Sequence, residues 1–200
     1  MRELLNKVLY GSSSSPQGVS SNDGSQSLIV RPHPNDDNLL VIMPANSPKD
    51  APPLYTISKR SSNPNFVLHR GFPSPKNTVA VASMHISTST VDLSVYNQPM
   101  VIKNSSITGS WSFDTHMGKF KWKVNQYTGT GFELYDRQGN KIAKYGNAGL
   151  MNFGEKQLSI YVPGDEFFTA MVLLSAVASK ELAKVIEEVV GEVAGAVLGA

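Results

Sequence analysis

The sequence predicts a mainly β protein: an antiparallel, closed β-barrel of about 10–12 strands wrapped around one C-terminal hydrophobic helix. Many short segments rich in β-branched and aromatic residues come first along the chain, and turn residues separate them. One long apolar run, residues 167–178, follows these segments. A helix that is apolar on every side must be buried, and antiparallel strands cover it most simply by closing around it.

The composition is that of one globular domain, with 200 residues of which 40% are hydrophobic and 17% are charged. A net charge of +2 is too small to predict a nucleic acid partner. Because the chain has no cysteine, disulfides and thiolate metal ligands are excluded, and we expect no cofactor. The segment MRELLNKVLYG lacks the long apolar stretch of a secretory signal, so we expect a cytoplasmic protein, with peripheral attachment to a membrane as a further expectation.

Residues 1–27 are predicted to form a flexible segment ahead of the barrel. Leucine and valine in residues 1–10 share one side of a short helical pattern, which is typical of a loosely docked terminus, or of a membrane-surface or partner helix. Residues 11–27 are rich in serine and glycine and nearly free of apolar side chains, as in flexible linkers. The barrel domain is therefore expected over residues 28–180.

The barrel strands are predicted from short apolar or alternating runs that end in proline, glycine, asparagine or aspartate. These runs cover residues 28–30, 38–43, 53–59, 65–70, 78–86, 90–95, 99–103, 110–114, 119–125, 132–136, 141–145 and 156–162.

The clearest of these strands form a predicted meander over residues 109–162. A turn at residues 115–118 joins two strands as a hairpin, and a turn at residues 137–140 joins two more. In the last strand, residues 156–162, apolar and polar side chains alternate, which indicates one buried and one solvated face.

The central helix is predicted at residues 165–180. Pro163 and Gly164 stop the preceding strand, Asp165 stands where an N-cap is expected, and Glu166 places negative charge near the positive end of the helix dipole. The twelve apolar residues span about 18 Å, well short of the ~30 Å hydrocarbon core of a bilayer. Protein is therefore expected to surround this helix, and no transmembrane span is predicted.

Residues 181–200 continue the helical pattern but become amphipathic. Leucine, isoleucine and valine recur on one side, with glutamate and lysine on the other. Gly191, Gly195 and Gly199 lie four residues apart, a spacing that permits close approach of another helix. The extension is predicted either to fray as a tail or, over residues 181–198, to bind a protein partner or a second copy of the chain.

Three stretches of the chain resemble one known family. They are SWSFDTHMGKFKWK at residues 110–123, FELYDRQGNKIAKY at residues 132–145 and LSIYVPGDEFFTAMVLLSAVASKEL at residues 158–182. A Gly-x-Phe-x-Trp-Lys strand, an Ile-Ala-x-Tyr strand and a terminal apolar helix in this order resemble the tubby C-terminal superfamily. That superfamily also holds the LURP-one-related and phospholipid scramblase-like proteins, and the likeness is strongest to small fungal tubby-like domain proteins.

The resemblance implies a barrel around a central helix over about residues 28–180. It also implies binding of phosphoinositide headgroups by basic residues of the barrel surface, as in tubby domains, or an association with calcium and membrane lipids, as in scramblases. Tubby's basic ligand residues do not match this chain position by position. Residues 35–38, NDDN, lack the alternating oxygen ligands and the closing glutamate of an EF-hand loop.

Five lysines of the meander are the candidate ligand-binding residues: Lys119, Lys121, Lys123, Lys141 and Lys144. The first three alternate with Phe120, Trp122 and Val124, so on a strand the aromatic set is expected to face the helix. The three ammonium groups then stand about 7 Å apart on the outer face.

Such a row favours an anionic phospholipid headgroup, and a bilayer of anionic lipid gains about 1 kcal/mol from each lysine. Lys59, Arg60 and Arg70 are expected to extend the patch if the barrel brings them near. The alternative is that the lysines only keep an outer face soluble and a sheet edge unpaired. The predicted function is a non-catalytic binding module for phosphoinositide or another anionic membrane surface, with a protein-interaction domain as the alternative.

Residues typical of catalysis or metal binding show no matching pattern. The four histidines, His33, His69, His85 and His116, have neither HxH nor HExxH spacing, so we predict no metal site. No GxSxG motif accompanies the serines, and the glycines of the meander belong to turns rather than to a phosphate-binding loop. The sequence therefore predicts no enzyme.

Overall fold

The computed structural model describes residues 24–48, 50–125, 131–149 and 154–198, the last eight of these by backbone alone. Twelve strands precede one long helix in the described part of the chain. The strands are β1 (Gln26–His33), β2 (Asp36–Pro44), β3 (Tyr55–Lys59), β4 (Phe66–Arg70), β5 (Thr78–His85), β6 (Thr90–Val95), β7 (Gln98–Asn104), β8 (Trp111–Thr115), β9 (Gly118–Val124), β10 (Phe132–Tyr135), β11 (Lys141–Asn147) and β12 (Lys156–Ile160). A 3₁₀ turn, η1 (Pro75–Asn77), precedes β5, and the helix is α2 (Glu166–Leu198).

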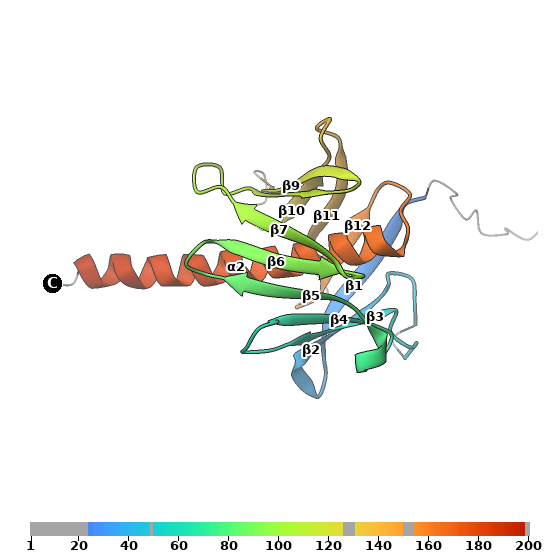
Figure 1. Ribbon diagram of the computed structural model, residues 1–200. Coiled ribbons are helices and arrows are strands. Elements are labelled where there is room, and N and C mark those ends of the chain that lie inside the picture. Colours follow the sequence, from blue (N-terminus) through green and yellow to red (C-terminus); the bar gives the residue numbers. More distant parts are fainter. Residues whose placement is uncertain (1–23, 49, 126–130, 150–153, 199–200) are drawn as a thin grey trace, which may run out of the picture.

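The strands form one closed antiparallel barrel in which each strand pairs with its neighbours in sequence. The ring closes where β1 pairs with β12, with Leu28 opposite Leu158. Short turns connect antiparallel neighbours without crossovers, so a meander is the simplest path for this chain. The predicted barrel around a C-terminal helix is confirmed (Figure 1).

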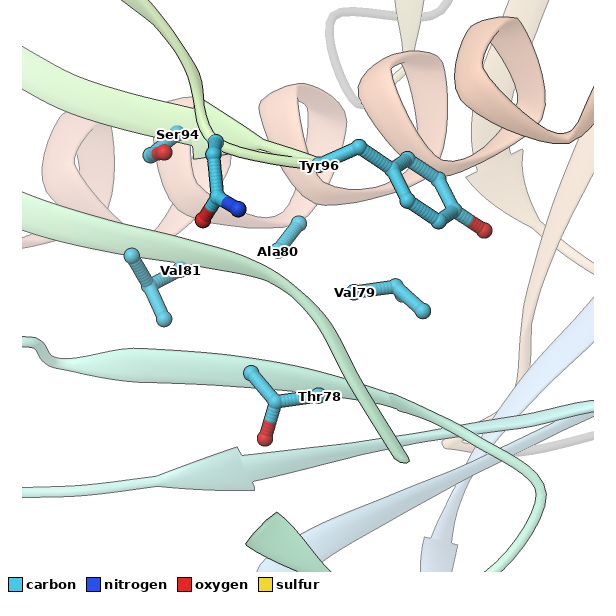
Figure 2. Close-up of a pocket in the computed structure, with 7 residues that line it drawn as sticks. Thr78, Val79, Ala80, Val81, Ser94 and Tyr96 are labelled. Carbon is cyan, nitrogen blue, oxygen red and sulfur yellow. The ribbon is translucent and has the colours of Figure 1, made fainter. Parts of the chain in front are cut away.

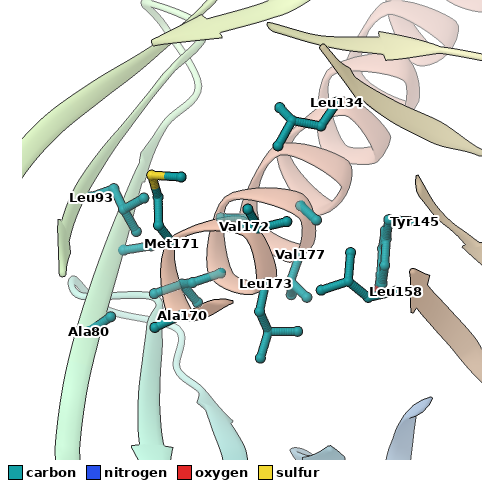
Figure 3. Close-up of a cluster of buried hydrophobic side chains, with 14 of the residues drawn as sticks. Ala80, Leu93, Leu134, Tyr145, Leu158, Ala170, Met171, Val172, Leu173 and Val177 are labelled. Atoms are coloured by element: carbon teal, nitrogen blue, oxygen red, sulfur yellow. The ribbon is translucent and has the colours of Figure 1, made fainter. Parts of the chain in front are cut away.

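The helix α2 passes through the barrel and supplies the centre of the hydrophobic core. Every residue from Phe168 to Ser179 is buried. Leu93 of β6, Leu134 of β10 and Leu158 of β12 surround it, as Figure 3 shows. A helix that is apolar all round is stable only in such an environment, because each of its faces then contacts a strand.

The start of α2 is capped as predicted. Asp165 Oδ1 accepts a hydrogen bond of 2.8 Å from the backbone N–H of Phe168, the N3 position of the helix. Glu166 lies in the first turn. The cap fixes where the helix enters the barrel, since one of its otherwise unpaired amides is satisfied there.

The helix lies off the barrel axis, closest to β4, β5 and β6. Ala80 and Ala82 are buried on the inner face of β5, and their small side chains permit this close backbone approach. Strands β8 to β10 lie further around the ring, and the large buried side chains of Trp111, Trp122 and Phe132 fill the wider gap on that side. The size of the inward residues thus sets the position of the helix.

The polar residues within the apolar run have partners. Ser175 Oγ accepts a hydrogen bond of 3.0 Å from Trp122 Nε1 and donates one of 3.1 Å to the carbonyl of Val172. Thr169 Oγ1 donates to Gln26 Oε1 at 3.2 Å. These bonds offset the cost of burying hydroxyl groups and fix the rotation of α2 relative to β1 and β9.

The domain boundaries differ from the prediction at both ends. Strand β1 begins at Gln26, so residues 26 and 27, assigned to the linker, belong to the barrel. The helix continues past residue 180 as predicted, but Leu182, assigned to the extension beyond the barrel, is fully buried. Residues 1–23 of the predicted flexible segment lie outside the described residues, as does Gly199, whereas Gly191 and Gly195 are described by their backbone alone.

Candidate functional site

The outer face of β9 carries the lysine row that the alternation predicts. Phe120 and Trp122 are buried against the helix side, whereas Lys119 and Lys123 are exposed and Lys121 is half-buried on the outside. Val124, the last residue of the strand, is 41% exposed.

The strand register places further lysines beside this row. Lys103 of β7 lies opposite Ser112, Ser112 opposite Lys121, Lys121 opposite Tyr135, and Tyr135 opposite Lys141. Lysines two strands apart in this order are about 10 Å apart across the sheet. Lys103 was not predicted, because only the pairing of β7 with β8 brings it to this face.

A second row runs beside the first. Lys123 of β9 lies opposite Glu133 of β10, and Glu133 lies opposite Lys144 of β11. Lys119 lies opposite Asp114 at the end of the hairpin. We use the name lysine face for the six lysines Lys103, Lys119, Lys121, Lys123, Lys141 and Lys144.

One carboxylate, that of Glu133, reduces the charge of the lysine face. Glu133, whose side chain is only 14% exposed, forms an ion pair of 3.3 Å with Lys141. Partial burial pushes the pKa of Glu133 upward, but hydrogen bonds from Tyr135, Lys141 and Asn125 outweigh that effect and keep the pKa below its ordinary value. Glu133 is therefore anionic at neutral pH and neutralises Lys141.

The remaining lysines are more available to a ligand. The ammonium group of Lys123 lies 4.5 Å from the centre of the Tyr135 ring. Within the residues that the structure describes, no ion pair engages Lys103, Lys119, Lys121 or Lys144. These four ammonium groups can each meet a phosphate oxygen without first breaking an ion pair.

The prediction that Lys59, Arg60 and Arg70 extend this patch is wrong. Strand β3, which ends at Lys59, lies six strands from β9 in a ring of twelve, on the opposite side of the barrel. Arg70 of the neighbouring β4 forms an ion pair of 2.6 Å with Glu166 at the start of α2. The position of a residue around a barrel depends on the order of the strands, and this order cannot be read from the residues next to Lys59, Arg60 and Arg70 in the sequence.

The histidines lie apart from one another. His69 is buried and bonds the carbonyl of Ser74 at 3.0 Å, and burial lowers the pKa of its ring. His85 pairs with Asp92 at 2.9 Å, and the ring of His116 packs on Phe167. Among the described residues, no three histidine, aspartate or glutamate side chains are grouped as metal ligands would be.

A hollow on the outside of β5 and β6 offers little to an anion. Figure 2 shows Thr78, Val79, Val81 and Tyr96 around it, and its volume is about 190 Å³. Ligand pockets usually measure about 300–1,000 Å³. No charged side chain lines the hollow, so the lysine face remains the better candidate.

The described part of α2 is not long and apolar enough to cross a membrane.

Comparisons of the chain with models of protein families, with curated proteins and with solved structures each found no match.

Proposed function

We propose that the protein is a non-catalytic module that binds anionic membrane surfaces, phosphoinositide-containing ones among them, through the lysine face. The observation that carries the proposal is the alignment of lysines from β7, β9 and β11 on one outer wall. Each lysine near an anionic bilayer contributes about 1 kcal/mol, so the attachment is weak and depends on salt. A cytoplasmic protein attached peripherally to membranes fits this chemistry.

The resemblance to the tubby C-terminal superfamily supports the proposal. Tubby domains bind phosphoinositide headgroups through basic residues of the barrel surface, and the architecture which the resemblance implies is the one described above. The proposed ligand residues of this chain, the lysines of β7, β9 and β11, differ from those of tubby domains.

Replacing Lys119, Lys121 and Lys123 together by glutamine is expected to weaken binding to vesicles of anionic lipid by about 100-fold, because three lysines contribute about 3 kcal/mol. Co-sedimentation with vesicles that contain or lack phosphoinositide measures the effect. Raising the salt concentration should weaken binding of the unaltered protein in the same assay.

A matched variant controls for net charge. Lys59→Gln, Arg60→Gln and Lys76→Gln remove three positive charges from strands and turns on the other side of the barrel. This variant should bind vesicles almost as well as the unaltered protein. Equal loss in both variants, or unchanged binding by the lysine variant, would contradict the proposed face.

A second candidate function is self-association or partner binding through the end of α2. The helix continues past the barrel, as Figure 1 shows, and Val189 and Val190 are 46% and 62% exposed there. Lys184 pairs with Glu188 at 3.6 Å on the same segment, one turn apart, so this segment has a charged side beside its apolar one. This pattern is typical of helices that pack against another helix.

Val189→Glu with Val190→Glu is expected to convert a self-associated protein to a monomer, because two carboxylates cannot be buried between helices without a large desolvation cost. Light scattering coupled to size-exclusion chromatography gives the mass of both forms. Val101→Glu, which adds charge at an exposed valine of β7, is the control and should leave the mass unchanged. A monomeric unaltered protein would refute self-association.

A further inference from the structure

A chamber of about 560 Å³ opens at the end of the barrel where α2 leaves it. Six consecutive strands, β7 to β12, each supply a residue at or beside this end of the strand, and α2 closes the other side. The strand residues are Asn104, Trp111, Val124, Phe132, Asn147 and Lys156. The volume lies within the range of about 300–1,000 Å³ that is typical of ligand pockets.

The chamber exists because the helix is off-centre. Since α2 lies nearest to β4, β5 and β6, the space between it and the opposite strands is widest. Deeper in the barrel, aromatic side chains fill this space, and at the open end the aromatic residues that line it, among those the structure describes, are Trp111 and Phe132. Together with Ala183 and Ile186 of α2, they form a largely apolar wall.

Three lysines line the chamber, and one of them, Lys184, pairs with Glu188 at 3.6 Å. Lys156 has the same strand parity as the inward-facing Leu158 and Ile160, and its Nζ donates a hydrogen bond of 2.6 Å to Asn147 Oδ1. Lys180 Nζ lies 5.6 Å from the centre of the Phe132 ring.

Charges of both signs surround Lys180. Burial lowers the pKa of Lys180, and the nearby charge of Lys156 lowers it further. Glu181 and Glu187, which also line the chamber, act in the opposite direction but do not restore the ordinary pKa. An anion between the two lysines would relieve their mutual repulsion.

We propose that this chamber binds an amphipathic anion: a molecule with one carboxylate or phosphate head and a single apolar chain. The head lies between Lys156 and Lys180, with the amide of Asn147 as a further polar contact, and the chain lies against Trp111 and Ile186. The site is independent of the lysine face, because none of the six lysines of that face lines the chamber.

Dodecanoate and dodecyl phosphate, each below its micellar concentration, are the probes, and calorimetric titration of the full chain measures binding. At least one of them is expected to bind saturably, with one molecule per chain and at least 10-fold more tightly than dodecanol, which has the same chain without the charge. The tighter of the two identifies the head that the site prefers. If neither binds more tightly than dodecanol, the proposal is refuted.

Two variants locate the binding. Lys156→Met with Lys180→Met keeps the apolar length of both side chains and should reduce the affinity for the anionic probe at least 10-fold, whereas Lys76→Met in η1, which belongs neither to the chamber nor to the lysine face, should leave it unchanged. Ala183→Trp places a bulky ring in the chamber and should abolish binding of the probe.

Thermal melting followed by circular dichroism checks that each variant is folded. Unchanged affinity in the folded double lysine variant, or in the folded Ala183→Trp variant, would overturn the assignment. Neither variant alters the lysine face. Unchanged probe binding in these variants would therefore refute the chamber as the binding site without contradicting the proposal that the lysine face binds vesicles.

Discussion

The substitution Leu173→Asp is expected to leave the chain unfolded. Leu173 is fully buried in the part of α2 that the barrel encloses, and Figure 3 shows its side chain directed toward the strands. A carboxylate without a partner in such a place costs several kcal/mol, while a domain of this kind has only about 5–15 kcal/mol of total stability. Far-UV circular dichroism should show loss of the β signal and no cooperative thermal transition.

The control for this experiment is on the same helix. Val190→Asp introduces the same carboxylate at a side chain that is 62% exposed, beyond the barrel, and should melt like the unaltered protein. A Leu173→Asp protein that is soluble and melts cooperatively would show that the barrel does not need an apolar centre.

Trp122→Ala is expected to lower the free energy of unfolding by about 3–5 kcal/mol. The indole is completely buried, packs against the Phe132 ring at a centroid distance of 6.4 Å and donates to Ser175 Oγ. Truncation removes the ring from the wide side of the barrel and leaves a cavity there. Urea denaturation measures the loss.

Trp122→Phe separates the two contributions of this residue. The variant keeps most of the ring volume but loses the N–H donor, so it should cost about 1 kcal/mol for the lost hydrogen bond, plus a smaller amount for packing. The hydroxyl of Ser175 still donates to Val172, which limits the cost. A Trp122→Ala variant no less stable than Trp122→Phe would contradict this account of the core.

The architecture could be predicted from the sequence because its signals are local. Alternation in β9 and β12, turn residues at 115–118 and the capping residue Asp165 each depend on neighbours in the chain, and the structure bears them out. The closed ring follows from one further fact, that an apolar helix needs cover on all sides.

Features that depend on strand order were not predictable in the same way. Lys103 joins the lysine face through the pairing of β7 with β8, and Lys59 is excluded from it by the position of β3. The chamber at the helix exit depends on where α2 lies, which Ala80 and Ala82 determine from the inside of one strand. Two alanines in a β-strand do not by themselves indicate that a helix packs against that strand.

The order of elements along the chain has a consequence for biosynthesis. The twelve strands leave the ribosome before α2. Until α2 is synthesised, the hydrophobic inner face of the nascent sheet is therefore exposed. A polypeptide released before residue 166 would keep that surface exposed and would be a ready client for chaperones or proteases. Synthesis of α2 therefore supplies the helix that covers the inner surface of the barrel.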